Sequence, residues 1–207
     1  MKIGIMGGTF NPIHNGHVAL ACRALSAYDL DEIWFLPNGK PPHKRNIGDE
    51  ENLKHRLEML LLAMKGHSAF KISFFEADRS EVSYSYATME HFRVVYPEHS
   101  FYFIVGADSL FSLKNWKHPQ RLLNVCTILA ACRDAYDNSK VEMEIDVIRQ
   151  AMGGDIRLLK MPPIPVSSRD IRKAIEEGHL EEIKTFLPES VYQYIVEKGL
   201  YQKRKCD

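Results

Sequence analysis

The chain has 207 residues, and its 27 Lys and Arg balance its 27 Asp and Glu, so the formal net charge is zero. The length suits one domain, and 45% hydrophobic with 26% charged residues excludes a disordered chain. The balanced charge argues against a histone-like nucleic-acid binder. With no signal peptide at the start and no apolar run near the ~18 residues of a membrane helix, we expect a cytoplasmic chain without membrane or nucleic-acid partners.

Six short apolar runs alternate along the chain with amphipathic helical patterns. The runs do not alternate polar with apolar residues, as is typical of parallel strands buried on both faces. The expected strands are Lys2–Met6, Glu32–Leu36, Phe70–Phe74, Ser100–Val105, Val125–Ala131 and Asp155–Leu159. The expected helices contain Val18–Leu25 and Leu53–Met64 and cover Ala87–Tyr96 and Lys140–Met152. This order predicts an α/β fold, a Rossmann-like open parallel sheet with helices on both faces.

The character of the chain changes after Leu159. A proline-rich stretch at 161–165 is followed by three helical patterns, at Ser168–Glu177, near Leu180–Phe186 and at Glu189–Lys198. We therefore expect residues 1–160 to form the core and residues 161–207 a small helical appendage, the two making one compact unit.

The four cysteines, at positions 22, 126, 132 and 206, are scattered, with no C-x-x-C pair. This spacing indicates reduced thiols rather than a disulfide framework. We interpret Cys22, Cys126 and Cys132 as small buried hydrophobic residues.

The segment from Gly7 to His17 carries the strongest chemical signal, because it joins the first strand to the first helix. Ligands of α/β sheets bind at the carboxyl ends of strands. Gly7 and Gly8 let backbone amides approach a ligand, and the helix start attracts an anion. His14 and His17 are three residues apart, so both rings can serve one phosphate group. A simple capped turn and a metal-binding His pair are the alternatives, but no third and fourth metal ligand is evident, so we expect no protein metal site.

Residues 8–12, Gly-Thr-Phe-Asn-Pro, and residues 14–17, His-Asn-Gly-His, resemble the signature of the nucleotidylyltransferase superfamily. Within it, the chain is most similar to the bacterial nicotinate-nucleotide adenylyltransferases, through motifs in the same order over nearly its whole length. The resemblance implies transfer of the adenylyl group of ATP to nicotinate mononucleotide, with release of pyrophosphate, in NAD biosynthesis. It implies that His14 and His17 contact the ATP phosphates as catalytic residues and that Gly8, Thr9 and Phe10 bind ATP.

Residues 166–172, Val-Ser-Ser-Arg-Asp-Ile-Arg, resemble the superfamily's I-S-S-T-x-[IV]-R motif. Two hydroxyls and free amides at a helix start, with Arg172 one turn later, suit an anion. A capping box from Ser167 to Asp170 is the alternative. The resemblance implies that Ser167, Ser168 and Arg172 hold the β- and γ-phosphates. Arg169 stands where the family usually has Thr.

Three further positions match the family. Lys44 ends a Pro-Pro-His-Lys segment, Gly106 and Asp108 belong to Gly-Ala-Asp-Ser, and Trp116 follows Leu-Lys-Asn. The resemblance implies that Lys44 bridges the two substrates, that Gly106 and Asp108 contact the nucleotide, and that Trp116 stacks on the pyridine ring. The alternatives without a role in binding are a solvated lysine in a Pro-rich loop for Lys44, a helix cap for Asp108 and a core tryptophan for Trp116.

Residues 83–89 resemble the family's S-Y-T-x-D-T-L segment, with Ser85 in place of Thr and Ala87 in place of Asp. The resemblance implies that the backbone at Ser85 helps to bind the nicotinate carboxylate. The change at Ala87 removes a side chain that supports this loop in the family.

The implied chemistry needs no general base, since the attacking phosphate is already ionised at neutral pH. Mg²⁺ is the expected cofactor, carried mainly by the ATP phosphates. The expected partners are ATP and nicotinate mononucleotide, and the sequence leaves a homo-oligomer open. A sister transferase acting on nicotinamide mononucleotide, pantetheine phosphate or flavin mononucleotide is one alternative function. A non-catalytic nucleotide sensor is the other.

Overall fold

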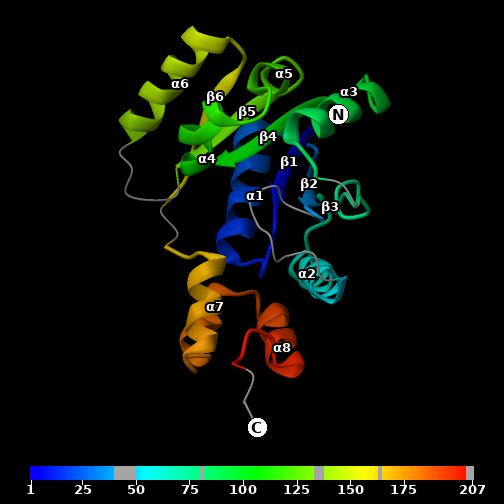
Figure 1. Ribbon diagram of the computed structural model, residues 1–207, viewed down its shortest axis with the longest axis vertical. Helices are drawn as coiled ribbons and strands as arrows, with labels where there is room; N and C mark the ends of the chain where they lie inside the picture. Colours follow the sequence, from blue (N-terminus) through cyan, green and yellow to red (C-terminus); the bar gives the residue numbers. More distant parts are fainter. Residues whose placement is uncertain (40–49, 80–81, 133–137, 163–164, 204–207) are drawn as a thin grey trace.

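The computed structural model describes residues 1–39, 50–79, 82–132, 138–162 and 165–203 (Figure 1). Six parallel strands form one sheet in the order β3-β2-β1-β4-β5-β6. The strands are β1 (Lys2–Gly8), β2 (Glu32–Pro37), β3 (Phe70–Ile72), β4 (Ser100–Gly106), β5 (Thr127–Cys132) and β6 (Ile156–Lys160). This strand order is that of a Rossmann-like fold and confirms the predicted fold class.

The edge strand β3 is shorter than expected. It ends at Ile72 rather than at Phe74. The Phe74 carbonyl accepts the amide of Asp78 in a turn, and the Phe74 side chain is exposed. Because β3 pairs only with β2, no second neighbour extends it.

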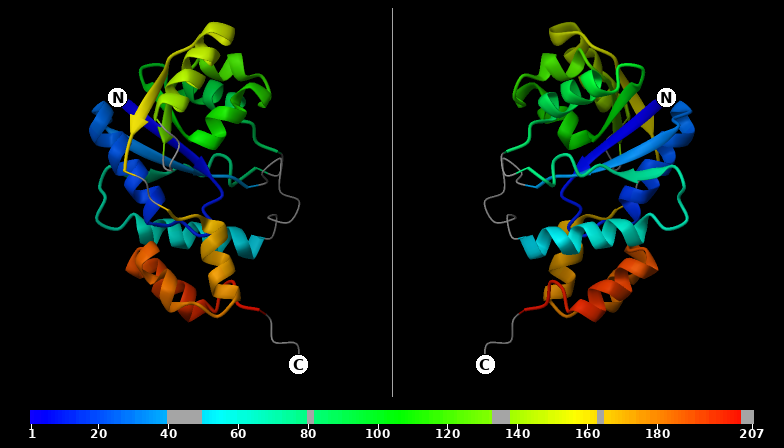
Figure 2. Two further views of the ribbon diagram at one scale, coloured as in Figure 1. Left: turned by 90° about the vertical axis from the view of Figure 1, so that its left-hand side faces the viewer. Right: turned by 90° about the vertical axis from the view of Figure 1, so that its right-hand side faces the viewer.

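Helices cover both faces of the sheet (Figures 1 and 2). On one face, α1 (Asn15–Tyr28) and α2 (Glu50–Ala63) bury Leu20, Met59 and Leu60 against the sheet. The other face is covered by α3 (Ser85–Val95), α4 (Ala107–Ser112), α5 (Pro119–Leu123) and α6 (Asn138–Met152). Within the described ranges, no helix is long and apolar enough to cross a membrane.

Three short helical segments between β4 and β5 were not expected from the sequence. They are α4, the 3-10 turn η1 (Leu113–Asn115) and α5. Each is too short to show a helical repeat of apolar residues, which is the signal used for the longer helices. Together they form one side of the region beyond the carboxyl end of β4.

The C-terminal segment contains α7 (Ser168–Glu176), the 3-10 segment η2 (Glu181–Phe186) and α8 (Glu189–Lys198). Figure 1 shows α7 and α8 beyond the carboxyl ends of the strands. Their apolar side chains, including Ile171, Ile175 and Val191, join the core that α1 and α2 build. The C-terminal segment therefore packs on the sheet and lies beyond the carboxyl ends of the strands.

Two of the cysteines match the interpretation as small core residues. Cys126 and Cys132 are buried in the core, whereas Cys22 is half-buried at its margin. Burial raises the pKa of the Cys126 thiol to about 12. A thiol with such a pKa is inert at neutral pH.

Strand order reverses between β1 and β4, because the chain moves outward from β1 to β2 and β3 and then returns to β4 on the other side. In open α/β sheets such a switch point is where ligands bind, beyond the carboxyl ends of the strands. The first predicted motif follows β1, and Gly106 ends β4. The fold thus brings two of the predicted segments to one edge.

Candidate active site

The turn between β1 and α1 is built from closely packed small and aromatic residues. Phe10 has φ of +49°, in the left-handed region that non-glycine residues rarely occupy. Its ring is buried between Phe35 and His17, with ring centroids 5.6 and 5.2 Å away. A Cβ on Gly8 would lie 3.0 Å from that ring, so any other residue there would require the Phe10 ring to shift. The side chain of Phe10 therefore supports His17 from within the core.

The two histidines of the first motif stack on one another at the start of α1. Their ring centroids are 3.7 Å apart, and His14 is almost fully buried. The backbone amide of His14 donates to Nδ1 of His17 at 3.3 Å. Since Nδ1 accepts, a neutral His17 carries its proton on Nε2. That tautomer makes Nε2 a hydrogen-bond donor, as a phosphate ligand requires.

Gly16, between the two histidines, lets the second motif approach. A Cβ at this position would lie 3.0 Å from the ring of His14 and 3.1 Å from Cγ1 of Val166. The spacing H-x-G-H therefore has a packing reason as well as a chemical one.

The second motif lies directly against the first. Ser168 Oγ donates to the carbonyl of Pro12 at 2.8 Å, and Arg172 Nη1 donates to the carbonyls of Asn11 and Ser168 at 2.5 and 3.1 Å. These contacts join residues 156 and 161 positions apart in the sequence. The fold thus brings Arg172 beside the turn that carries His14 and His17.

Ser167 has the capping role that was the alternative interpretation. It is the N-cap of α7, its Oγ accepts the amide of Asp170 at 3.1 Å, and the same hydroxyl donates to the Asp170 carboxylate at 2.6 Å. A cap and an anion site use the same helix end, so the cap does not exclude the predicted phosphate contact.

A cavity of about 860 Å³ opens at the carboxyl ends of β1 and β4. Predicted site residues that line it are Gly8, Thr9, His17, Ser85, Gly106 and Trp116. The indole Nε1 of Trp116 donates to Ser112 Oγ at 3.2 Å, which fixes its ring. The cavity is large enough for a nucleotide-sized ligand. It joins the first motif to the predicted pyridine-binding residues.

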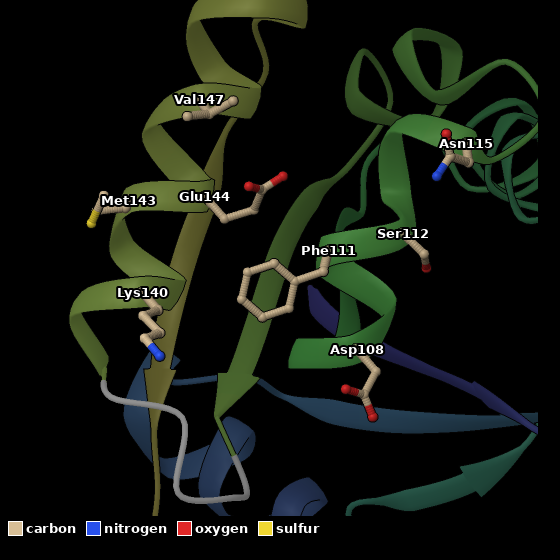
Figure 3. A pocket seen from close by; sticks show the side chains of 8 residues that line it. All are labelled: Asp108, Phe111, Ser112, Asn115, Lys140, Met143, Glu144 and Val147. Carbon is tan, nitrogen blue, oxygen red and sulfur yellow. The ribbon is translucent and has the colours of Figure 1, made fainter.

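Other predicted residues lie around this cavity rather than on its lining. His14, Phe10, Ser167, Ser168 and Arg172 adjoin the β1–α1 turn, as described above. Asp108 lines a neighbouring hollow of about 700 Å³ between α4 and α6 (Figure 3). Ser112 and Asn115 line both hollows, so only α4 and η1 separate them. Lys44 falls outside the described residues.

Two functional neighbours were missed by the sequence analysis. Arg56 of α2 is fully buried, and its Nη1 donates to the carbonyls of Thr9 and Asn38 at 2.8 and 2.9 Å. Burial lowers the pKa of this guanidinium, which still remains charged because its ordinary value is above 12. Arg56 thus ties the β1–α1 turn to the end of β2. No local sequence signal reveals such a long-range bond.

The other missed residue is Glu76, which lines the cavity. Its carboxylate is buried and accepts a hydrogen bond from Thr88 Oγ1 at 2.6 Å. Burial raises the pKa of this carboxyl, although the Thr88 bond acts in the opposite direction. The bond anchors the first turn of α3, which contains Thr88. The position of Glu76 just beyond β3, at the carboxyl edge of the sheet, was the available signal.

Metal ligands do not cluster in this site. Across the part of the chain that the structure describes, no three His, Cys, Asp or Glu side chains lie where they could share a metal ion. The site instead offers imidazole, hydroxyl, guanidinium and backbone donors, which suit phosphate oxygens.

Comparison with known proteins identifies the family of the chain. The family model described as cytidylyltransferase-like matches residues 5–174. A protein of Thermoanaerobacter sp. (strain X514) named "Probable nicotinate-nucleotide adenylyltransferase" is 38% identical, covering 98% of this chain and 95% of its own length. One of the same name from Lachnoclostridium phytofermentans is 39% identical, with 97% and 98% covered. The chain therefore belongs to the cytidylyltransferase-like family and, within it, to the nicotinate-nucleotide adenylyltransferases.

Two solved structures have a similar fold. The Plasmodium falciparum nicotinic acid mononucleotide adenylyltransferase complexed with NaAD superposes with a TM-score of 0.79 at 20% identity, covering 97% of each chain. The same protein complexed with APC gives a TM-score of 0.76. At this identity the match establishes the fold.

Proposed function

We propose that this chain transfers the adenylyl group of ATP to nicotinate mononucleotide, giving nicotinic acid adenine dinucleotide and pyrophosphate. The observation that carries the proposal is the contact between the two motifs, Ser168 and Arg172 against Pro12 and Asn11, beside a cavity lined by His17 and Trp116. The names of the relatives, at 38% and 39% identity over nearly the whole chain, support the same activity.

The chemistry is an in-line attack of the mononucleotide phosphate on the α-phosphorus of ATP. Because that phosphate is ionised at neutral pH, the enzyme supplies position and charge rather than a base. His17 would donate from Nε2 to an α-phosphate oxygen, with His14 holding its ring. Charge builds on the leaving pyrophosphate, and donors placed there stabilise it.

The β- and γ-phosphates would lie at the start of α7, held by Arg172 and by the backbone amides of Ser167 and Ser168, because both serine hydroxyls already donate, to Asp170 and to Pro12. Both hydrogen bonds from Arg172 to the backbone carbonyls of Asn11 and Ser168 use Nη1. The guanidinium's other donors, Nε and Nη2, are the ones that would reach the phosphates. Gly8, Thr9 and the Phe10 backbone would contact the nucleotide from β1, with Gly106 and Asp108 from the end of β4. Lys44 would bridge the two substrates.

The acceptor would lie at the other end of the cavity, with its pyridine ring against Trp116 and its carboxylate at the amides near Ser85. Mg²⁺, carried by the ATP phosphates, would neutralise part of their charge. The donor set fits a metal that brings its own ligands, since Mg²⁺ often keeps waters and phosphates in place of protein carboxylates.

The test is pyrophosphate release with ATP and Mg²⁺, run in parallel with nicotinate mononucleotide and nicotinamide mononucleotide. Strong release with the acid and weak release with the amide is expected. Release only with another acceptor, such as pantetheine phosphate, would assign a sister transferase. ATP binding without release under any of these conditions would assign a nucleotide sensor.

A further inference from the structure

Charged side chains are few around the cavity. Among the described residues that line it, Lys117 is the one Lys or Arg and Glu76 the one carboxylate. Glu76 is already engaged by the hydrogen bond from Thr88 Oγ1. The Lys117 side chain is exposed, so a ligand in the cavity can reach its ammonium group. The cavity therefore has one cationic side chain among its described lining residues, and this residue, Lys117, is not one of the predicted site residues.

Lys117 contacts the side chain of the residue that begins a helix. Its Nζ is 4.4 Å from the ring centre of Tyr84, which is the N-cap of the eleven-residue helix α3. The amides of Ala87 and Thr88 donate to the Tyr84 carbonyl, whereas those of Ser85 and Tyr86 precede the first hydrogen-bonded turn. The ammonium and the dipole of α3 thus act at the same end of the cavity.

Trp116, on which the pyridine ring is proposed to stack, lines the same cavity as Lys117. Trp116 directly precedes Lys117, and both residues line the cavity. The Trp116 ring is held by its bond to Ser112 and stands edge-on to Phe103, with an interplanar angle of 90°. Trp116, Lys117 and the start of α3 thus line the same cavity, so one ligand can meet an aromatic face, an ammonium and backbone amides there.

We propose that Lys117 is a specificity-determining residue, whose ammonium pairs with a carboxylate on the stacked pyridine ring and so favours the acid over the carboxamide. This inference rests on the proposed function and names the source of its selectivity. A carboxylate gains a charge-assisted hydrogen bond from the ammonium, and a carboxamide gains only a neutral acceptor contact. Tyr84 holds the ammonium by a cation–π contact until the carboxylate arrives.

The test is the substitution Lys117→Met, assayed for kcat and KM with nicotinate mononucleotide and with nicotinamide mononucleotide at saturating ATP. We expect kcat/KM for the acid to fall about tenfold, the scale of one hydrogen bond to a charged group, through KM rather than kcat. The value for the amide and the KM for ATP stay unchanged. Lys117→Arg, which keeps the charge, restores most of the selectivity.

Lys114→Met is the matched control, since it removes the same charge three residues away, at an ion pair with Glu144 outside this cavity. It should leave the acid-to-amide ratio unchanged. Raising the salt concentration to about 0.5 M should lower the selectivity of the wild type but not that of Lys117→Met, because salt screens an exposed cation.

Three outcomes would overturn the inference. An equal fall with both acceptors would make Lys117 a structural residue, and an unchanged ratio would remove it from recognition. In both cases the wild type still turns over the acid, so the proposed function stands. A wild type that releases pyrophosphate with neither acceptor would remove the proposed function and this inference together.

Discussion

At the scale of single residues, the site depends on groups whose partners fix their chemical form. The bond from the His14 amide to Nδ1 of His17 selects the Nε2–H tautomer of His17. Phe10 packs against the same ring from the core. His17 is thus an oriented donor at the end of a helix, which is the arrangement that stabilises developing charge without reorganisation.

His17→Ala should lower kcat/KM by at least ~10²-fold, the cost of removing one transition-state donor. The substitution also removes the side chain that accepts the His14 amide, at about 1 kcal/mol of stability. Steady-state kinetics with a parallel thermal melt separate the two effects. His179→Ala, at an exposed position beyond α7, is the control. Near-normal turnover in a folded His17→Ala protein would exclude His17 from the mechanism.

The buried Glu76 carboxyl predicts how the stability of the fold changes with pH. Its pKa is raised in the folded state, so the folded protein binds more protons than the unfolded chain between the two pKa values. Stability from this group therefore falls as pH rises through that window. Glu76→Gln keeps an acceptor for Thr88 and removes the charge. At neutral pH the melting temperature of Glu76→Gln should be higher than that of the wild type. The difference should shrink below about pH 4, near the pKa of glutamate in the unfolded chain.

Thr88→Val is the counterpart, because it leaves the buried Glu76 carboxyl without its donor. It should cost about 1–3 kcal/mol in chemical denaturation. If Glu76→Gln melts at the wild-type temperature across the whole pH range, Glu76 carries no net penalty in the fold.

At the scale of elements, two helix starts meet. The N-terminus of α1 carries the histidines, and the N-terminus of α7 carries Ser168 and Arg172. The bonds to Pro12 and Asn11 hold them together. Two positive helix ends at one place repel each other weakly, and a triphosphate between them relieves that repulsion. The packing of Gly16 against His14 and Val166 sets how closely they approach.

Gly16→Ala should lower kcat/KM by roughly tenfold, because the new Cβ displaces the His14 ring or Val166 by a few tenths of an ångström. Stability should change little, since Ala favours the helix by up to ~1 kcal/mol over Gly and this offsets the contact. Steady-state kinetics check the fall in kcat/KM, and chemical denaturation of the same preparation checks the unchanged stability. Equal loss of activity and stability would indicate general misfolding instead.

At the scale of the whole molecule, the sequence predicted the sheet well because buried parallel strands have a local signature. The six strands and the longer helices follow from apolar runs and helical repeats. The short segments between residues 107 and 123 carry no such repeat. Contacts such as Arg56 to Thr9, Thr88 to Glu76 and Lys117 to Tyr84 depend on pairing between distant segments, which no local pattern encodes. The meeting of the two motifs was expected only through the family resemblance.

The C-terminal segment reaches the site through Tyr201. Its hydroxyl donates to Asn11 Oδ1 at 2.6 Å, and burial raises the pKa of the phenol. Tyr201→Phe should cost about 1–3 kcal/mol, because the buried Asn11 loses its donor, and should lower kcat/KM several-fold. Denaturation and kinetics check it. Tyr194→Phe, which loses a bond to His55 rather than to the turn, should keep wild-type kinetics.

The bonds that hold Asn11 and Pro12 have a consequence for synthesis of the chain. Their partners are Ser168, Arg172 and Tyr201, more than 150 positions downstream. During translation the N-terminal strands emerge first and can begin to pair. The turn that carries the histidines, however, acquires its last partners only after residue 201 has left the ribosome. We therefore expect the turn to reach its final geometry only after the segment through Tyr201 has emerged and folded.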